Sequence, residues 1–168
     1  SATPILCNGG NSTVTVSASG GVAPYSGTGT FTVSAGTHSY TVTDANGCSK
    51  TTSVTVTEPT LLVASSSATA ILCNGGSSNV TVSATGGTAP YSGTGTFTVS
   101  AGTHAYTITD ANGCTKKTSV TVTQPTALVA TSSATTIICN GGNSTVTVGA
   151  SGGVGPYSGI GTFSVTAG

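Results

Sequence analysis

Apolar and polar residues alternate along short segments of the chain. In residues 13–18, Val14, Val16 and Ala18 fall on one face, and threonine and serine fall on the other. Successive side chains of a β-strand point to opposite faces, so this alternation predicts a half-buried strand. No segment has the spacing of an amphipathic helix. The same alternation recurs in three further segments of the first part of the chain: 30–34, 39–44 and 53–57.

Turn-forming residues separate these predicted strands. Glycines lie between the first two, and the sequence Asp-Ala-Asn-Gly at 44–47 follows the third. Aspartate suits the first position of a type I turn, and asparagine and glycine suit its left-handed end. Short strands spaced roughly 8–12 residues apart are typical of an immunoglobulin-like sandwich. We therefore expect an all-β fold.

The whole pattern repeats along the chain. Cys7, Cys73 and Cys139 are evenly spaced, and each begins the sequence Cys-Asn-Gly-Gly. Residues 1–59 and 67–125 are identical at 49 of 59 positions, and a third copy begins near residue 133 and stops partway. This spacing predicts tandem small immunoglobulin-like β-sandwich repeats of about 66 residues, cut as a window from a longer array.

Proline marks the predicted boundaries between repeats. Pro59 and Pro125 each follow the last strand-like segment of a copy, where a residue without a backbone N–H is tolerated. We expect three domains: a first repeat with its first strand clipped, a complete second repeat, and a truncated third repeat. Their predicted ranges are 1–59, 60–125 and 126–168.

Five cysteines fit a disulfide in each repeat. A repeat this small has few large core side chains and needs additional stabilisation. The expected pairs are Cys7–Cys48 and Cys73–Cys114, each closing a loop of about 40 residues and stabilising the fold by roughly 3–4 kcal/mol. Cys139 would pair with a cysteine outside residues 1–168.

The within-repeat pairing depends on strand parity. If four strands separate the two cysteine-bearing turns of a repeat, both turns lie at the same end of the sandwich. Pairing between repeats, Cys48–Cys73 and Cys114–Cys139, is the alternative. A zinc site would require C-x-x-C spacing or nearby histidines, which the sequence lacks. Disulfides imply an oxidising compartment, so we expect a secreted or cell-surface protein.

Charge is scarce: 4% of residues are charged and the net charge is zero. The chain has no basic patch for phosphates, so we expect no nucleic-acid partner. No stretch approaches the roughly 18 apolar residues that span a bilayer, so we expect no membrane span in these residues.

Candidate chemistry is sparse. His38 and Asp44 belong to one predicted strand and lie roughly 20 Å apart, too far for a catalytic triad. Each repeat offers one aspartate in its turn, which makes a poor calcium site. An isopeptide bond from Lys50 is disfavoured because Gln124 replaces Glu58 in the second copy, and a surface ion pair with Asp44 is simpler. We expect no enzyme, no metal and no cofactor.

The sequence also contains candidate glycosylation sites. The sequence N-x-S/T, the acceptor for N-linked sugars, occurs three times, at Asn11, Asn79 and Asn143. The serine- and threonine-rich faces could also carry O-linked sugars.

Three motifs carry a family resemblance. They are Cys-Asn-Gly-Gly at 7–10, Gly-Gly-x-x-Pro-Tyr at 20–25, and Thr-Asp-Ala-Asn-Gly-Cys at 43–48, and all recur in the second copy. The chain resembles the SprB-type repeat of bacterial gliding-motility and cell-surface adhesins over nearly its whole length. The resemblance implies a very large surface protein, exported by type IX secretion and used in adhesion or gliding. The chain departs from many such repeats after Pro-Tyr-Ser, where it lacks an aromatic-rich strand.

These observations favour a structural role. We expect an extracellular stalk or filament shaft on a bacterial surface, whose partners are neighbouring repeats or copies of itself. Strand edges normally carry charges that prevent edge-to-edge pairing, and these strands have almost none, which favours lateral packing into a fibre. The alternative is a module that binds surface glycans or another ligand. Its only repeated candidate aromatics are Tyr25, Tyr91 and Tyr157.

Overall fold

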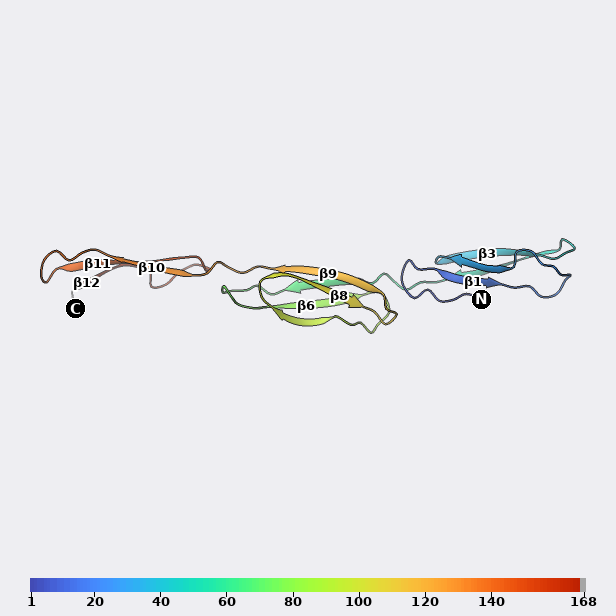
Figure 1. The fold of residues 1–168 in the computed structure, drawn as a ribbon, viewed down its shortest axis with the longest axis horizontal. Coiled ribbons are helices and arrows are strands. Elements are labelled where there is room, and N and C mark those ends of the chain that lie inside the picture. Colours follow the sequence, from blue (N-terminus) through green and yellow to red (C-terminus); the bar gives the residue numbers. More distant parts are fainter. Residues whose placement is uncertain (167–168) are drawn as a thin grey trace. The chain divides into compact units, whose positions relative to one another are not determined.

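The protein is all-β throughout residues 1–166, the part that this computed structural model describes (Figure 1). Twelve strands account for its regular structure. They are β1 Ser12–Val16, β2 Gly29–Val33, β3 Gly36–Thr43, β4 Ser49–Val56, β5 Val63–Ala68, β6 Ser78–Thr85, β7 Gly95–Val99, β8 Gly102–Thr109, β9 Thr115–Val122, β10 Val129–Ala134, β11 Asn143–Ser151 and β12 Gly161–Thr166.

The strands recur with the sequence repeat. β2, β3 and β4 are followed one repeat later by β7, β8 and β9, which have the same lengths. The four segments predicted from alternation, beginning at 13, 30, 39 and 53, coincide with β1 to β4 within a few residues. The prediction of an all-β fold is therefore confirmed.

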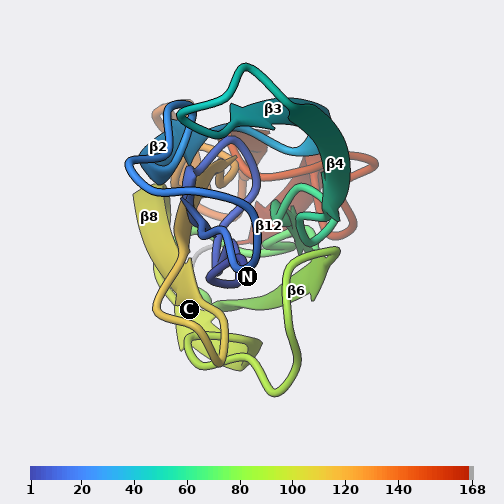
Figure 2. The ribbon, with the colours of Figure 1, turned by 90° about the vertical axis from the view of Figure 1, so that its right-hand side faces the viewer.

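The pairs β1-β2, β3-β4, β10-β11 and β11-β12 are antiparallel. The sheets have the orders β1-β2, β3-β4, β5-β6-β7, β8-β9 and β10-β11-β12. Figure 2 shows β3 and β4 side by side, as expected for neighbours joined by the turn at 44–48. Ser1–Thr3 pairs with β1 as well: Thr15 donates to the Ser1 carbonyl over 2.8 Å, and Thr3 donates to the Thr13 carbonyl over 3.1 Å.

A two-layer core joins the sheets β1-β2 and β3-β4. Val14 and Val16 of β1 are buried together with Val56 of β4, and Phe31 and Tyr40 pack against them with ring centroids 4.8 Å apart. These are the inward positions of the alternating pattern, because each strand turns its valines and aromatics to one side. The same positions of the next copy are buried again: Val80, Val82 and Val122.

The described residues form two compact units. The first comprises residues 1–65, 82–95 and 106–118, and it contains the β1-β2 and β3-β4 sheets. The second comprises residues 66–81, 96–105 and 119–168, and it contains the β10-β11-β12 sheet.

Candidate functional site: a disulfide between two turns

A disulfide joins two turns that lie far apart in the sequence. Cys7 is bonded to Cys114, 107 residues later, with the two Cα atoms 5.7 Å apart. Cys7 begins the Cys-Asn-Gly-Gly turn of the first copy, and Cys114 ends the Asp-Ala-Asn-Gly-Cys turn of the second. The bond therefore connects different copies of the repeat, within the first compact unit.

The predicted pairs Cys7–Cys48 and Cys73–Cys114 are therefore wrong in this structure. The alternative pairs Cys48–Cys73 and Cys114–Cys139 are wrong too, because Cys48, Cys73 and Cys139 are exposed free thiols.

Strand parity explains the error. Three strands, β6, β7 and β8, separate the two cysteine-bearing turns of a copy, not four. In the first copy, Cys48 directly precedes β4, whereas Gly9 of the Cys7 turn donates a hydrogen bond to Glu58, beyond the other end of β4. Ten residues of extended chain span roughly 30 Å. A disulfide needs Cα atoms within about 7 Å, so Cys7 and Cys48 cannot meet.

The turn at 110–114 is organised by one carboxylate. Oδ1 of Asp110 accepts hydrogen bonds from the backbone N–H groups of Asn112 and Cys114, each over 2.9 Å. Oδ2 accepts from the N–H of Thr88 over 2.9 Å. These donors, that of Thr88 first, hold the pKa of Asp110 below its usual value. The predicted turn is confirmed, with Gly113 donating to the Asp110 carbonyl at its end.

The turn at 7–10 is held by the end of its own copy. Nδ2 of Asn8 donates to the Pro59 carbonyl over 3.0 Å, and the N–H of Gly9 donates to the Glu58 carboxylate over 2.6 Å. Asn74 and Gly75 make the same two bonds to the next copy's joint, over 2.9 and 2.8 Å. There the acceptor is Gln124, since an amide oxygen serves as well as a carboxylate oxygen. The change from Glu58 to Gln124 disfavours an isopeptide bond, but it preserves the hydrogen bond from the glycine N–H of the turn. The sequence did not reveal this contact.

The two turns contact each other directly beside the disulfide. Nδ2 of Asn112 donates to the Leu6 carbonyl over 2.9 Å and to Oγ1 of Thr88 over 3.0 Å. Sγ of Cys114 lies 3.4 Å from the same Leu6 carbonyl oxygen. Hydrogen bonds to a buried aspartate thus position both Asn112 and Cys114 against residues 6–7.

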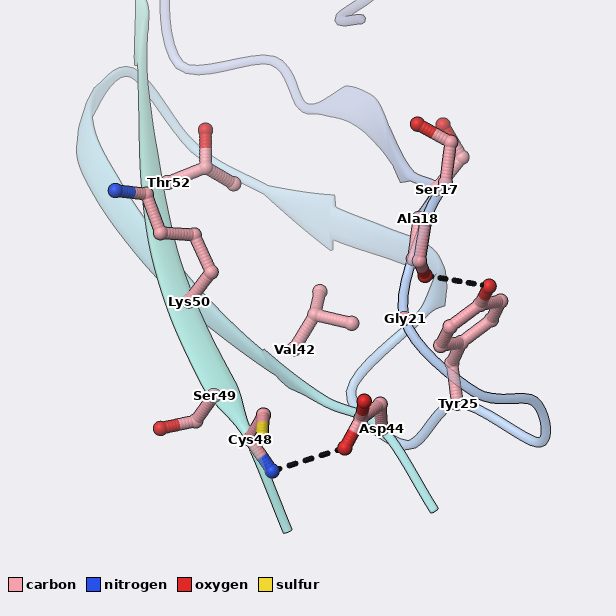
Figure 3. A pocket seen from close by; sticks show the side chains of 12 residues that line it. Ser17, Ala18, Gly21, Tyr25, Val42, Asp44, Cys48, Ser49, Lys50 and Thr52 are labelled. Carbon is pink, nitrogen blue, oxygen red and sulfur yellow. Dashed lines mark hydrogen bonds between the residues drawn. The ribbon is translucent and has the colours of Figure 1, made fainter. Parts of the chain in front are cut away.

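The equivalent turn at 44–48 has no such partner segment within residues 1–166 and borders an open cavity. Asp44 accepts from the N–H groups of Cys48, Asn46 and Val22, which hold its pKa below the usual value, Cys48 foremost. In Figure 3 the Asp44–Cys48 bond and Tyr25 lie on the cavity wall. The cavity measures about 330 Å³. Lys50, expected opposite Asp44, instead lies opposite Val42 in the β3-β4 register and is exposed.

The remaining candidate residues have structural partners. Nε2 of His38 donates to the Ser34 carbonyl over 2.9 Å, a contact local to the start of β3. The hydroxyl of Tyr25 donates to the Gly20 carbonyl over 2.7 Å, and Tyr91 and Tyr157 bond Gly86 and Gly152 in the same way. These tyrosines are half-buried and brace the Gly-Gly loop.

The three candidate glycosylation residues, Asn11, Asn79 and Asn143, are exposed. Asn79 also accepts a hydrogen bond from Oγ1 of Thr98 over 3.0 Å. Within residues 1–166, no group of three or more histidines, cysteines or carboxylates is placed to hold a metal ion. The same residues contain no helix long and apolar enough to cross a membrane.

No protein-family model matches the chain, and no curated protein sequence matches it.

Proposed function

We propose that this chain is part of the structural repeat region of a large secreted bacterial surface adhesin, in which tandem immunoglobulin-like repeats form a stalk or filament shaft. The observation that carries the proposal is the Cys7–Cys114 bond. It joins one copy of the sequence repeat to the next, so the link between copies is covalent in addition to the backbone. In a shaft under tension, such a bond keeps neighbouring repeats covalently linked.

The exposed faces support a spacer role. Threonines pair across β3 and β4 through their hydroxyl groups, Thr37 with Thr55 over 3.0 Å and Thr41 with Thr51 over 2.9 Å. Thr103 and Thr121 repeat the first of these pairs in β8 and β9 over 3.0 Å. Such neutral ladders stabilise the sheet by about 0.2–1 kcal/mol per pair and offer no charged site for a ligand.

The distribution of lysine refines the expectation of lateral packing. All three lysines lie in β4 and β9, which are equivalent edge strands: Lys50, Lys116 and Lys117. β2 and β7, which end the sheets β1-β2 and β5-β6-β7, carry no charge. Since charged edges discourage pairing between chains, we propose that lateral association uses uncharged edges, among them those of β2 and β7.

Immunogold electron microscopy tests the proposed function. Antibodies raised against residues 1–168 are applied to intact cells and to thin sections of the source organism, and extracellular fibres should be labelled at a regular spacing. Labelling confined to the cell interior, or to isolated points without fibres, would contradict a shaft and favour a discrete binding module.

A further inference from the structure

The second compact unit contains an uncovered apolar site at the third copy of the repeat. A cavity of about 570 Å³ lies there. Its walls come from the 72–74 turn and from the loop and strands of residues 126–160. Among the side chains that line the cavity, Leu128 is 63% exposed, Val154 is 69% exposed and Ile160 is 45% exposed. Such a group of large apolar side chains indicates a surface that another segment covers.

The first compact unit shows what covers the equivalent site one repeat earlier. There the end of β8 and the turn at 110–114 lie against the loop: Ser92 and Thr109 exchange two backbone hydrogen bonds over 2.8 and 3.1 Å. Ala111 donates to the Thr88 carbonyl over 2.8 Å. Leu62, the equivalent of Leu128, is only 5% exposed. The occupant is therefore a hairpin with an Asp-Ala-Asn-Gly-Cys turn.

The vacant site already has the geometry of the filled one. Gly153 donates to the Thr126 carbonyl over 2.8 Å, as Gly87 does to the Thr60 carbonyl over 2.8 Å. Tyr157 donates to the Gly152 carbonyl, which braces this loop as Tyr91 braces its counterpart. The backbone of Val154 occupies the position of Thr88, whose N–H and carbonyl bind the turn.

The cysteine at this site is also in place. Asn74 and Gly75 hold the 73–76 turn through Pro125 and Gln124, the same contacts that hold the Cys7 turn. Cys73 is an exposed free thiol, and it lines the cavity. A partner in the arrangement of Cys7–Cys114 would lie 107 residues further along a repeating chain.

We propose that this site, formed by Leu72–Asn74 and by residues between 126 and 160, is an acceptor for a β-hairpin of the chain's own repeat type, and that Cys73 forms a disulfide with the cysteine of the hairpin's turn. The proposal deepens the proposed function and rests on it for the source of the hairpin, which corresponds to the part of a repeat that β8 and β9 form in the second copy. The docking itself rests on this site's geometry alone. Every copy would then be bonded to the next through its first cysteine.

A peptide of residues 102–123 tests the site on the full chain. Cys114 is its single cysteine, and it is supplied as a mixed disulfide with an aromatic thiol. The Cys73 thiolate attacks the peptide sulfur, a new S–S bond forms, the old one breaks, and the aromatic thiolate leaves with the electron pair. Mass spectrometry then reports which of Cys48, Cys73 and Cys139 carries the peptide.

Docking raises the local concentration of the peptide disulfide beside Cys73 only, so coupling there should be at least about tenfold faster than at the two other exposed thiols. An unactivated Cys114→Ser peptide should slow that coupling by competition. A peptide with Asp110→Ala should lose the preference for Cys73, because its turn no longer has the carboxylate that binds the loop. Equal coupling at all three cysteines, or equal coupling of a scrambled peptide, would overturn the proposal.

The outcome is separable from that of the microscopy. Selective coupling without labelled fibres would retain the acceptor site and reject the shaft. Labelled fibres without selective coupling would support the proposed filament shaft and reject the proposed acceptor site at Cys73.

Discussion

Asp44 and Asp110 occupy equivalent positions in identical turns, yet their surroundings differ. Both accept hydrogen bonds from three backbone N–H groups. Asp110 is only 5% exposed, whereas Asp44 is half-buried beside an open cavity. The turn at 110–114 also carries the disulfide, so its carboxylate supports more of the surrounding structure.

Replacing the two aspartates separately should therefore give unequal effects. Asp110→Ala leaves three partly buried donors without their acceptor and should lower the midpoint of chemical denaturation. Asp44→Ala, the matched control, removes the same atoms at a site open to water and should lower the midpoint less. Asp110→Asn, which keeps one acceptor oxygen, should recover part of the loss. Equal midpoints for the two alanine variants would contradict the inferred role.

Acid should act on the same residues. Both aspartates have a folded-state pKa below the value of about 3.9 of an unfolded chain, so each contributes stability that is fully present above that pH. The contribution is lost as the pH falls through the lower folded-state pKa. Thermal melts between pH 5 and pH 2 should show a falling midpoint in this low range, and Asp110→Asn should flatten the fall. A midpoint independent of pH below about 4 would reject this.

At the scale of elements, charge distinguishes strands that are otherwise alike. β4 and β9 carry lysine on a free edge, and β2 and β7 carry only glycine, threonine, phenylalanine and valine. The sequence alone suggested unprotected edges everywhere, because it did not say which strands lie at an edge. The sheet order supplies that information.

A lysine on the uncharged edges should block association. Thr30 in β2 and Thr96 in β7 are exposed, so the double variant Thr30→Lys and Thr96→Lys should shift high-concentration samples toward monomer in analytical ultracentrifugation. Thr51→Lys is the matched control, since β9 already has Lys117 at that position. Association that persists in the double variant, or that Thr51→Lys also abolishes, would exclude these edges as the contact.

At the scale of the whole molecule, the disulfide closes a large loop. Cys7 and Cys114 are separated by 107 residues. In the chain-entropy treatment, a loop of about 100 residues gives roughly 4–5 kcal/mol of stabilisation, more than the loops of about 40 residues first expected. Cys114→Ser should lower the free energy of unfolding by an amount of this order, measured by denaturant titration. Cys48→Ser, which changes an exposed free thiol, should leave it unchanged.

The sequence was a good guide to the strands and a poor guide to the disulfide. Alternation of Val14, Val16 and their counterparts predicted the strands because burial on one face fixes a period of two. The motif at 44–48 predicted its turn because local hydrogen bonds define it. The cysteine pairing depends on how many strands lie between two turns. The prediction assumed four strands where the structure has three, so it placed Cys48 at the same end of the repeat as Cys7. No local pattern could show that Asn112 reaches Leu6, since the two residues are 106 positions apart.

The loop between Cys7 and Cys114 also changes what proteolysis can do. A protease that cuts one peptide bond anywhere from residue 8 to residue 113 leaves both fragments joined through sulfur. If Cys73 forms the proposed bond 107 residues further along, successive loops overlap over residues 73–114. Every peptide bond of the array would then be bypassed by at least one disulfide, and no single cut would sever the chain.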